Sequence, residues 1–280
     1  MLGRIFAGAV VLATALSIAT TASAFDESKY PAFQGQWLRK LGTTVNAWDE
    51  TKRPGLAQAP PLTPEFRKLW LDSMADQAAG GQGLDHRMTC VSNGMPRMAT
   101  IVRQQEVFIR PEMTLIVFEN NLPRRIYTDG RDFTANDNVP SYNGYSIGKW
   151  VDENGDGIYD VLEVETRNFK GPRIYDQGGI PLHPDNQSVI HERMYLDKNN
   201  PDTMVSEITV TDNALTRPWK VVKNYRREKN VEWYEDLCSE NNNHVVIGKE
   251  NYFMSADGYL MPAKKDQQPP DLRYFKKTGN

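Results

Sequence analysis

Side chains that could hold a metal ion are concentrated in one acidic run, residues 152–163. Oxygen-bearing side chains alternate along the run, and a glycine stands at its sixth position, where the chain must turn sharply. This pattern matches the loop of EF-hands, which directs about six to eight oxygen atoms at a calcium ion. We therefore predict a structural calcium ion. Its ligands would be five side chains and the backbone carbonyl of the isoleucine: Asp152, Asn154, Asp156, Ile158, Asp160 and Glu163.

The segments on either side of this run favour strands over the helices of an EF-hand. Residues 145–151 and 161–166 are short and rich in β-branched and aromatic residues, which are typical of strands. The run is therefore predicted to cap a β-hairpin. The alternative is an acidic hairpin turn without an ion, because Asp, Asn and Gly dominate tight turns for steric reasons alone.

A second group of candidates lies on one predicted strand and the turn that follows it. Residues two apart on a strand share a face, so Arg125, Tyr127 and Asp129 are expected to point together. Inside a barrel mouth they could bind a carboxylate or a phenol, with Arg125 as a forked donor. The alternative is a solvent-facing charged strip with an ion pair, since charged side chains are mostly exposed. The ligand-binding candidates are Arg125, Tyr127 and Trp150.

A third group surrounds the histidines His183 and His191. Histidine is the natural general base near neutral pH, and Glu192 or Asp212 on neighbouring strands could be its partner. His191 and Glu192 are adjacent on a predicted strand, however, so they should face opposite sides of the sheet. The sequence has no His-Glu-x-x-His motif and no phosphate-binding glycine loop. The candidates for acid–base catalysis are Tyr127, Asp129, His191, Glu192 and Asp212.

The first 24 residues are predicted to be a secretory signal peptide. Arg4 supplies a positive charge, an apolar stretch follows it, and Ala22-Ser23-Ala24 is a typical cleavage site. The mature protein, residues 25–280, is then expected in the periplasm or outside the cell, without a membrane span. The chain has 36 acidic and 33 basic residues, and this mild acidity argues against a nucleic-acid partner.

The two cysteines, Cys90 and Cys238, are far apart in the sequence. In an oxidising compartment such a pair most often forms one disulfide. Neither cysteine has a Cys-x-x-Cys partner or a Cys/His cluster nearby, so redox or zinc chemistry is not expected. We predict a structural disulfide between them.

One helix is expected in the N-terminal part of the mature chain. Thr63 is a suitable N-cap, Pro64 suits the first helical position, and Gly80-Gly81 should end the helix. One face of this helix would be apolar, because hydrophobic residues recur at three- and four-residue spacing. The residues of this face are Phe66, Leu69, Trp70 and Met74.

The remainder of residues 25–280 predicts a single all-β domain. There are about ten short strands separated by turn residues, with no alternation of strands and helices, and this pattern favours one antiparallel β-barrel. The final two strands are expected to form a hairpin. The predicted strands are 35–39, 106–110, 113–119, 124–128, 145–151, 161–166, 188–196, 204–211, 219–225, 245–248 and 251–254.

The tripeptide Gly35-x-Trp37 on the first predicted strand resembles the Gly-x-Trp signature of lipocalins and related calycin barrels. This resemblance implies a closed cup whose end is plugged by the tryptophan, with a disulfide that ties the wall to a terminal segment. The segments 124–131, 143–150, 208–212 and 216–219 are also similar to a family of secreted proteobacterial proteins of unassigned function.

Three functions remain open from the sequence. The first is a periplasmic or secreted barrel that binds a small apolar or amphipathic molecule, with calcium stiffening one hairpin. The second is a cofactor-free lyase, hydratase or isomerase that acts on a small hydrophobic substrate inside the barrel. The third is a structural or envelope-interaction protein without a pocket. The content of the barrel distinguishes them, because fold alone does not imply function.

Overall fold

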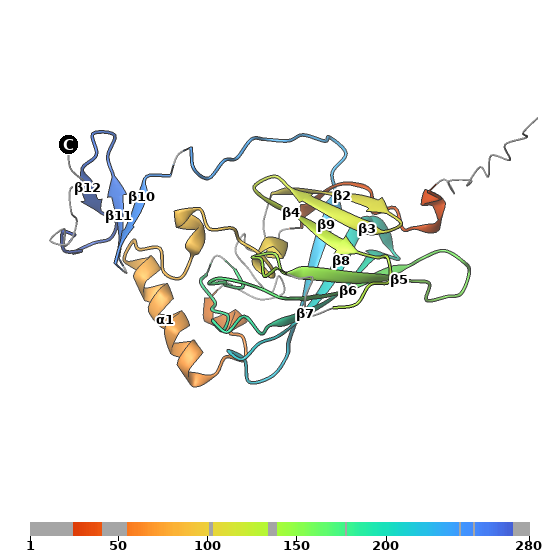
Figure 1. Cartoon of the computed structure of the whole chain (residues 1–280), viewed down its shortest axis with the longest axis horizontal. Coiled ribbons are helices and arrows are strands. Elements are labelled where there is room, and N and C mark those ends of the chain that lie inside the picture. Colours follow the sequence, from red (N-terminus) through yellow and green to blue (C-terminus); the bar gives the residue numbers. More distant parts are fainter. Residues whose placement is uncertain are drawn as a thin grey trace, which may run out of the picture.

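The computed structural model describes residues 25–40, 55–100, 103–133, 139–176, 178–240, 242–248 and 250–270. The predicted signal peptide, residues 1–24, lies outside the described residues. Nine strands follow one another around a closed barrel, and β1 pairs with β9 to complete it (Figure 1). They are β1 (Gly35–Arg39), β2 (Gln104–Arg110), β3 (Met113–Phe118), β4 (Asn121–Tyr127), β5 (Tyr145–Val151), β6 (Val161–Arg167), β7 (Val189–Asp197), β8 (Asn200–Thr211) and β9 (Trp219–Arg227).

Alternating side chains explain why these segments form a barrel wall. On β9, for example, Trp219, Val221, Lys223 and Tyr225 are buried, while the residues between them are exposed or half-buried. Strands with one face on a core and one in solvent show this period of two. The prediction of a closed barrel is confirmed.

One pair of neighbouring strands departs from the predicted antiparallel arrangement. β4 and β5 run parallel, and they pair only at Ile126 with Ser146 and at Tyr127 with Ile147. Parallel neighbours need a longer connection than a hairpin, and residues 128–144 supply it. The short pairing leaves a seam in the wall beside Arg124, which precedes the paired residues of β4.

The predicted helix is present, but it does not come first in the fold. Helix α1 (Pro64–Ala78) begins after Thr63, whose Oγ1 accepts a hydrogen bond from the N–H of Phe66 at 3.5 Å. Because β1 precedes α1, the prediction of an N-terminal helix is wrong in this respect. Phe66 and Trp70 are buried as predicted, whereas Leu69 is 41% exposed, so the buried face is narrower than the sequence pattern indicated. Four short 3₁₀ helices complete the helical structure of the described residues: Glu27–Lys29, Gly55–Gln58, His86–Thr89 and Arg97–Thr100.

The last strands form a separate small sheet outside the barrel. This sheet contains β10 (His244–Ile247), β11 (Glu250–Met254) and β12 (Leu260–Pro262), of which the sequence pattern predicted only the first two. The sheet lies beside α1, away from the barrel (Figure 1). Lys264 after β12 contacts Asp76 of α1 at 3.0 Å. An arm, described for residues 228–240 and 242–243, connects the barrel to this sheet.

The barrel interior is filled by side chains. Trp37 is fully buried, its Nε1 donates to the carbonyl of Phe33 at 2.7 Å, and the Arg227 guanidinium lies 4.3 Å from its ring centre. The largest fully buried side chains are Trp37, Tyr175, Phe33, Lys223, Met95, Met98, Ile109, Ile126, Leu162, Ile190 and Met204.

A buried ion pair crosses this filled interior. Arg124 on β4 donates to Glu192 on β7 through both Nη atoms, with Nη1 at 3.1 Å from Oε1. It also donates to Thr166 at 2.9 Å and to Ser146 at 3.3 Å. The guanidinium and the carboxylate are thus hydrogen-bonded as well as paired, which is the condition under which buried charges are tolerated.

Cys90 and Cys238 form the predicted disulfide, with their Cα atoms 5.6 Å apart. Cys90 precedes β2 and Cys238 lies in the arm, so the bond joins the arm to the segment between α1 and the barrel. Within the described part of the chain, no helix is long and apolar enough to cross a membrane.

Candidate functional site

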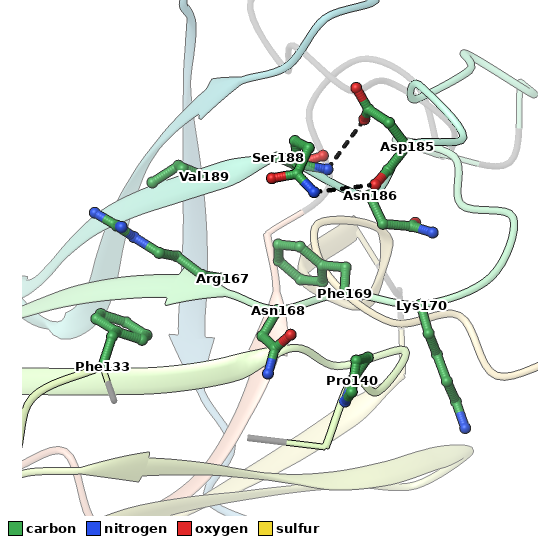
Figure 2. Close-up of a pocket in the computed structure, with 11 residues that line it drawn as sticks. Phe133, Pro140, Arg167, Asn168, Phe169, Lys170, Asp185, Asn186, Ser188 and Val189 are labelled. Atoms are coloured by element: carbon green, nitrogen blue, oxygen red, sulfur yellow. Dashed lines mark hydrogen bonds between the residues drawn. The ribbon is translucent and has the colours of Figure 1, made fainter. Parts of the chain in front are cut away.

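A large hollow lies at one end of the barrel, where β6 ends and β7 begins (Figure 2). Its volume is about 710 Å³. We call it the cleft. Its lining comes from the β4–β5 connection, the end of β6 and the loop before β7, and consists of Phe133, Pro140, Arg167, Asn168, Phe169, Lys170, Asp185, Asn186, Gln187, Ser188 and Val189.

Aromatic and cationic side chains occupy the cleft together. Arg167 lies over the ring of Phe133 at 5.1 Å, and Lys170 lies over the ring of Tyr142 at 5.3 Å. Arg167 and Lys170 stand at opposite ends of the lining, with Phe169 between them (Figure 2). A cation above an aromatic face is attracted by the ring and keeps its charge. Arg167 also pairs with Glu165, so Lys170 provides the positive charge of the lining that is open to a ligand.

Asp185 is the one carboxylate among the lining residues, and its own loop already engages it. The carboxylate accepts hydrogen bonds from the N–H of Gln187 at 3.0 Å and from Asn213 at 2.6 Å, and lies 2.9 Å from His183 Nδ1. Desolvation acts to raise its pKa, but these contacts outweigh it and lower the pKa of Asp185 below the ordinary value. Asp185 therefore stays charged and bonded to its loop.

Two lining residues adopt a backbone conformation that is rare for side-chain-bearing residues. Asn168 has φ +63° and Asn186 has φ +58°. Asparagine tolerates this left-handed region better than most residues, and such positions cluster at functional sites. Asn186 is held there by its side chain, which accepts from Arg173 Nε at 3.3 Å and donates to the carbonyl of Pro184 at 3.2 Å.

A buried network beneath the cleft fixes the loop before β7. Ser188 donates to Asp212 and accepts from Arg173 Nη2 at 2.7 Å. Asp212 also accepts from the backbone N–H of His183 at 2.9 Å and of Ala214 at 2.8 Å. Burial lowers the pKa of Arg173 to about 10, which leaves it charged at neutral pH. Because Ser188 and Asp212 are both engaged, this network positions the cleft and leaves no free nucleophile among its members.

A second hollow of about 350 Å³ adjoins the cleft and follows the seam between β4 and β5. Lys170 lines both, and no carboxylate within the described residues pairs with its Nζ atom. Arg124 and Ser146, both buried, also line this seam pocket. The remaining lining residues are Leu122, Pro123, Arg125, Tyr127, Ser141, Tyr142, Asn143, Gly144 and Tyr145.

The predicted ligand-binding residues fall in two places. Arg125 and Tyr127 line the seam pocket on the outer side of β4, while the inward position belongs to Arg124. Asp129 does not fix Arg125; it pairs with Arg131 at 2.6 Å, and Arg131 lies 3.8 Å above the Tyr127 ring. Trp150 is buried elsewhere, 5.2 Å from the Tyr30 ring.

The predicted acid–base candidates do not form one site. Tyr127 and Asp129 lie at the outer end of β4, and His191 is on the outer face of β7, 3.7 Å from Glu165. Glu192 is inside the barrel and paired with Arg124, and Asp212 is beneath the cleft. The expectation that His191 and Glu192 face opposite sides of the sheet is met.

The sequence contains one serine motif that is not among the predicted site residues. Residues 144–148 read Gly-Tyr-Ser-Ile-Gly, the pattern of a nucleophile elbow. In the structure, Ser146 lies within β5, is 1% exposed and bonds to Thr166 at 2.9 Å. An elbow requires an exposed serine on a strand-to-helix turn, so Ser146 is a structural residue.

The acidic hairpin between β5 and β6 has the predicted position, but its oxygens bind its own backbone. Asp152 accepts from the N–H groups of Gly157 at 2.8 Å and Gly155 at 2.7 Å, and these bonds lower the pKa of Asp152. Asn154 and Asp156 accept from the N–H groups two residues on, and Asp160 accepts from that of Glu153.

The sixth predicted ligand of this hairpin lies apart from the loop. Glu163 is within β6 and lies 3.4 Å from Arg193 of β7. Across the ranges that the structure describes, no group of three or more His, Cys, Asp or Glu side chains is arranged to hold a metal ion. The six-ligand set is therefore not assembled here, and calcium binding stays a prediction.

Comparison with models of protein families, with curated proteins and with solved structures found no match to this chain. The cleft is thus described from its own residues. Sequence reasoning missed Arg167, Phe169 and Lys170, because they follow a strand end without a recognisable motif. The signal that could have found them is the dense mixture of aromatic and basic residues between β6 and β7.

Proposed function

We propose that the protein binds a small amphipathic molecule with an acidic group, such as an aromatic or aliphatic carboxylate, in the cleft. One observation carries this proposal: the cleft combines aromatic side chains with Lys170, a cation that no carboxylate of the described residues pairs. The other two charged groups of the lining are engaged, Arg167 by Glu165 and Asp185 by its own loop. Pockets of roughly 300–1,000 Å³ with apolar walls and a few placed polar groups are typical of small-molecule sites. The ring of Phe133, which is half-buried, would contact the apolar part, and Lys170 the acidic group.

Lys170 is the central residue of the proposed site. It stands between the cleft and the seam pocket, so it can reach an acidic group from either hollow. A charged hydrogen bond from an ammonium to a carboxylate is stronger than a neutral one. Lys170 would therefore set the preference for anions, while the aromatic rings contribute affinity through apolar contact.

The filled interior favours this location over a ligand inside the barrel. The resemblance to lipocalins implies a cup with a central cavity, but large side chains and the Arg124–Glu192 pair occupy the centre here. A ligand at the barrel end and along the seam is compatible with the closed barrel. Secretion to the periplasm or beyond fits a disulfide-bonded binding protein and forms part of the proposal.

The experiment is a titration with anilinonaphthalene sulfonate, an aromatic anion whose fluorescence rises in apolar surroundings. Lys170→Gln should weaken binding about tenfold, the equivalent of one charge-assisted contact. Lys198→Gln removes an equally positive but distant side chain of the exposed β7–β8 turn and should leave affinity unchanged. Equal affinity for the wild type and Lys170→Gln, or equal losses in both variants, would contradict the proposal.

A specific observation keeps the enzymatic alternative open. His183 lies at the edge of the cleft, where its Nδ1 accepts a hydrogen bond from the Asp185 N–H at 3.2 Å and lies 2.9 Å from the Asp185 carboxylate. A histidine beside a carboxylate is the usual arrangement of a general base. A cofactor-free lyase, hydratase or isomerase would use His183 as the base on a ligand held by Lys170. Incubation of a bound ligand with wild type and with His183→Gln would separate the two functions. A ligand changed by the wild type alone would favour catalysis, and an unchanged ligand would favour binding.

A structural calcium ion at the hairpin is a separate proposal. Asp152, Asn154, Asp156, Asp160 and the carbonyl of Ile158 would hold it, while Glu163 would remain with Arg193. The ion would tie the loop together and so stiffen the hairpin. Its support is the alternating oxygen pattern, and it is tested by comparing variants in calcium and in chelator, as described below.

A further inference from the structure

A third hollow lies where the arm passes the β3–β4 turn and is joined to the chain by the disulfide. Its volume is about 380 Å³. We call it the disulfide pocket, and its existence does not depend on the cleft or on the proposed function. Its lining is Arg87, Cys90, Val91, Ser92, Asn93, Glu119, Asn120, Asn121, Leu122, Asp236, Leu237 and Cys238.

The lining of this pocket contains buried polar atoms without hydrogen-bond partners. They are both carboxylate oxygens of Glu119, the Oδ1 atoms of Asn93 and Asn120, and the Nδ2 atom of Asn121. Asn93 is 7% exposed and the Glu119 side chain is 0% exposed. Buried polar groups in native proteins are nearly always bonded, because each unpaired group costs free energy. Four such residues around one pocket indicate a ligand.

The unpaired atoms define the chemistry of that ligand. Four of the five are hydrogen-bond acceptors, and only the Asn121 amide is a donor. The ligand must therefore donate several hydrogen bonds. The guanidinium of the lining does not supply them: Arg87 donates to the Asn120 carbonyl and to Asp236, each at 3.3 Å.

The charge of the pocket also favours a ligand with N–H donors, and one that is positively charged. Arg87 and Asp236 pair with each other, so Glu119 carries the unbalanced charge of the lining. Its nearest cation among the described residues is Arg103, at 3.6 Å from Oε1 and half exposed, which is too far for a hydrogen bond. A buried carboxylate that lacks hydrogen bonds is strongly stabilised by a cation with N–H groups.

We propose that the disulfide pocket binds a small organic amine, with its ammonium group on Glu119, Asn93 and Asn120. Leu122, Leu237 and the disulfide provide an apolar wall for the carbon chain. A primary ammonium has three donors, which matches the excess of acceptors. A metal ion fits less well, because hard cations prefer several carboxylates and Asp236, the other acidic side chain of the lining, is engaged by Arg87.

The test is calorimetric titration of the disulfide-bonded protein with putrescine and with benzylamine. Saturable binding of at least one amine is expected, and tetramethylammonium, which has the charge but no N–H donor, should bind at least about tenfold more weakly. Glu119→Gln should reduce amine affinity at least about tenfold. Glu112→Gln, at an exposed position of the β2–β3 turn, serves as the matched control and should bind like the wild type.

Two results would overturn the proposal: no saturable binding of either amine up to about 10 mM, or equal affinity of wild type and Glu119→Gln. If Glu119→Gln does not fold, Asn93→Ser replaces it and should also weaken binding. Melting temperatures provide an independent readout without amine. Glu119→Gln should melt at the same or a higher temperature, because it removes an unsatisfied buried charge. A large decrease with unchanged amine affinity would make Glu119 purely structural.

Discussion

The cleft and the disulfide pocket differ in how their polar groups are satisfied. In the cleft, Asp185 accepts several hydrogen bonds from its own loop, and Ser188 is bonded to Asp212 and Arg173. In the disulfide pocket, Glu119 and Asn93 are buried, and the side-chain oxygens of both residues accept no hydrogen bond. The cleft presents cations over aromatic rings, whereas the disulfide pocket presents acceptors around a carboxylate. The two hollows should therefore select ligands of opposite charge.

The difference also concerns how each hollow is built. The cleft lining comes from one stretch of chain, residues 133–189, within the barrel. The disulfide pocket combines the segment before β2, the β3–β4 turn and the arm. Its integrity depends on a covalent bond between distant parts, and the cleft does not share that dependence. Perturbing the disulfide should therefore distinguish the two hollows.

The largest expected effect comes from removing that bond. Replacing both Cys90 and Cys238 with serine removes a link across 148 residues and should destabilise the protein by about 4–5 kcal/mol in the chain-entropy model. Below the melting temperature, the variant should lose amine binding and retain binding of anilinonaphthalene sulfonate. Denaturant unfolding and the two titrations measure this. If a folded variant lost binding of both ligands, this would contradict the assignment of the two ligands to separate hollows.

A buried carboxylate that is fully satisfied offers the contrast to Glu119. Glu192→Ala removes the partner of Arg124 and leaves an unpaired guanidinium inside the barrel. This should cost about 3–5 kcal/mol, as measured by urea denaturation. Removing both charges, with Arg124→Met and Glu192→Leu together, should cost much less. Equal free energies of unfolding for the single and the double variant would contradict the cost assigned to an unpaired guanidinium.

The pH dependence of stability probes a third buried carboxylate. Burial raises the pKa of Asp176 from 3.8 to about 6, although it accepts a hydrogen bond from the Gly178 N–H. The folded state therefore holds its proton more tightly than the unfolded state, and stability falls as pH rises from about 4 to 6. A shift of about two pKa units corresponds to roughly 3 kcal/mol. Asp176→Asn should remove this decrease. If the stability of the variant fell with pH as steeply as that of the wild type, Asp176 would not be its cause.

The smallest expected effect concerns the acidic hairpin. If the loop binds calcium through Asp156, Asp156→Asn should lower the melting temperature by a few degrees in calcium and leave it unchanged in chelator, since ligand binding stabilises only the folded state. Glu163→Gln, which alters the residue paired with Arg193, should behave alike in both conditions. Identical behaviour of Asp156→Asn in calcium and in chelator would remove the calcium proposal.

The sequence predicted local structure better than the assembled sites. Alternating residues identified β9, and Thr63 with Pro64 identified the start of α1, because these signals act over a few neighbouring residues. The parallel pairing of β4 with β5 and the separate sheet β10–β12 depend on contacts between distant segments. The disulfide pocket was not predictable for the same reason: Asn93, Glu119 and Asp236 meet only after folding. The acidic hairpin was conspicuous, yet its oxygens are engaged by its own backbone.

The most direct test is an amide NMR titration of the disulfide-bonded protein with both ligand classes. Anilinonaphthalene sulfonate should shift the amides of residues 167–170 and 185–189, which line the cleft. Putrescine should shift those of residues 90–93, 119–122 and 236–238, which line the disulfide pocket. Two separate sets of shifted amides are the predicted result. One shared set, or shifts outside both hollows, would contradict the assignment of opposite ligand charges to two distinct sites.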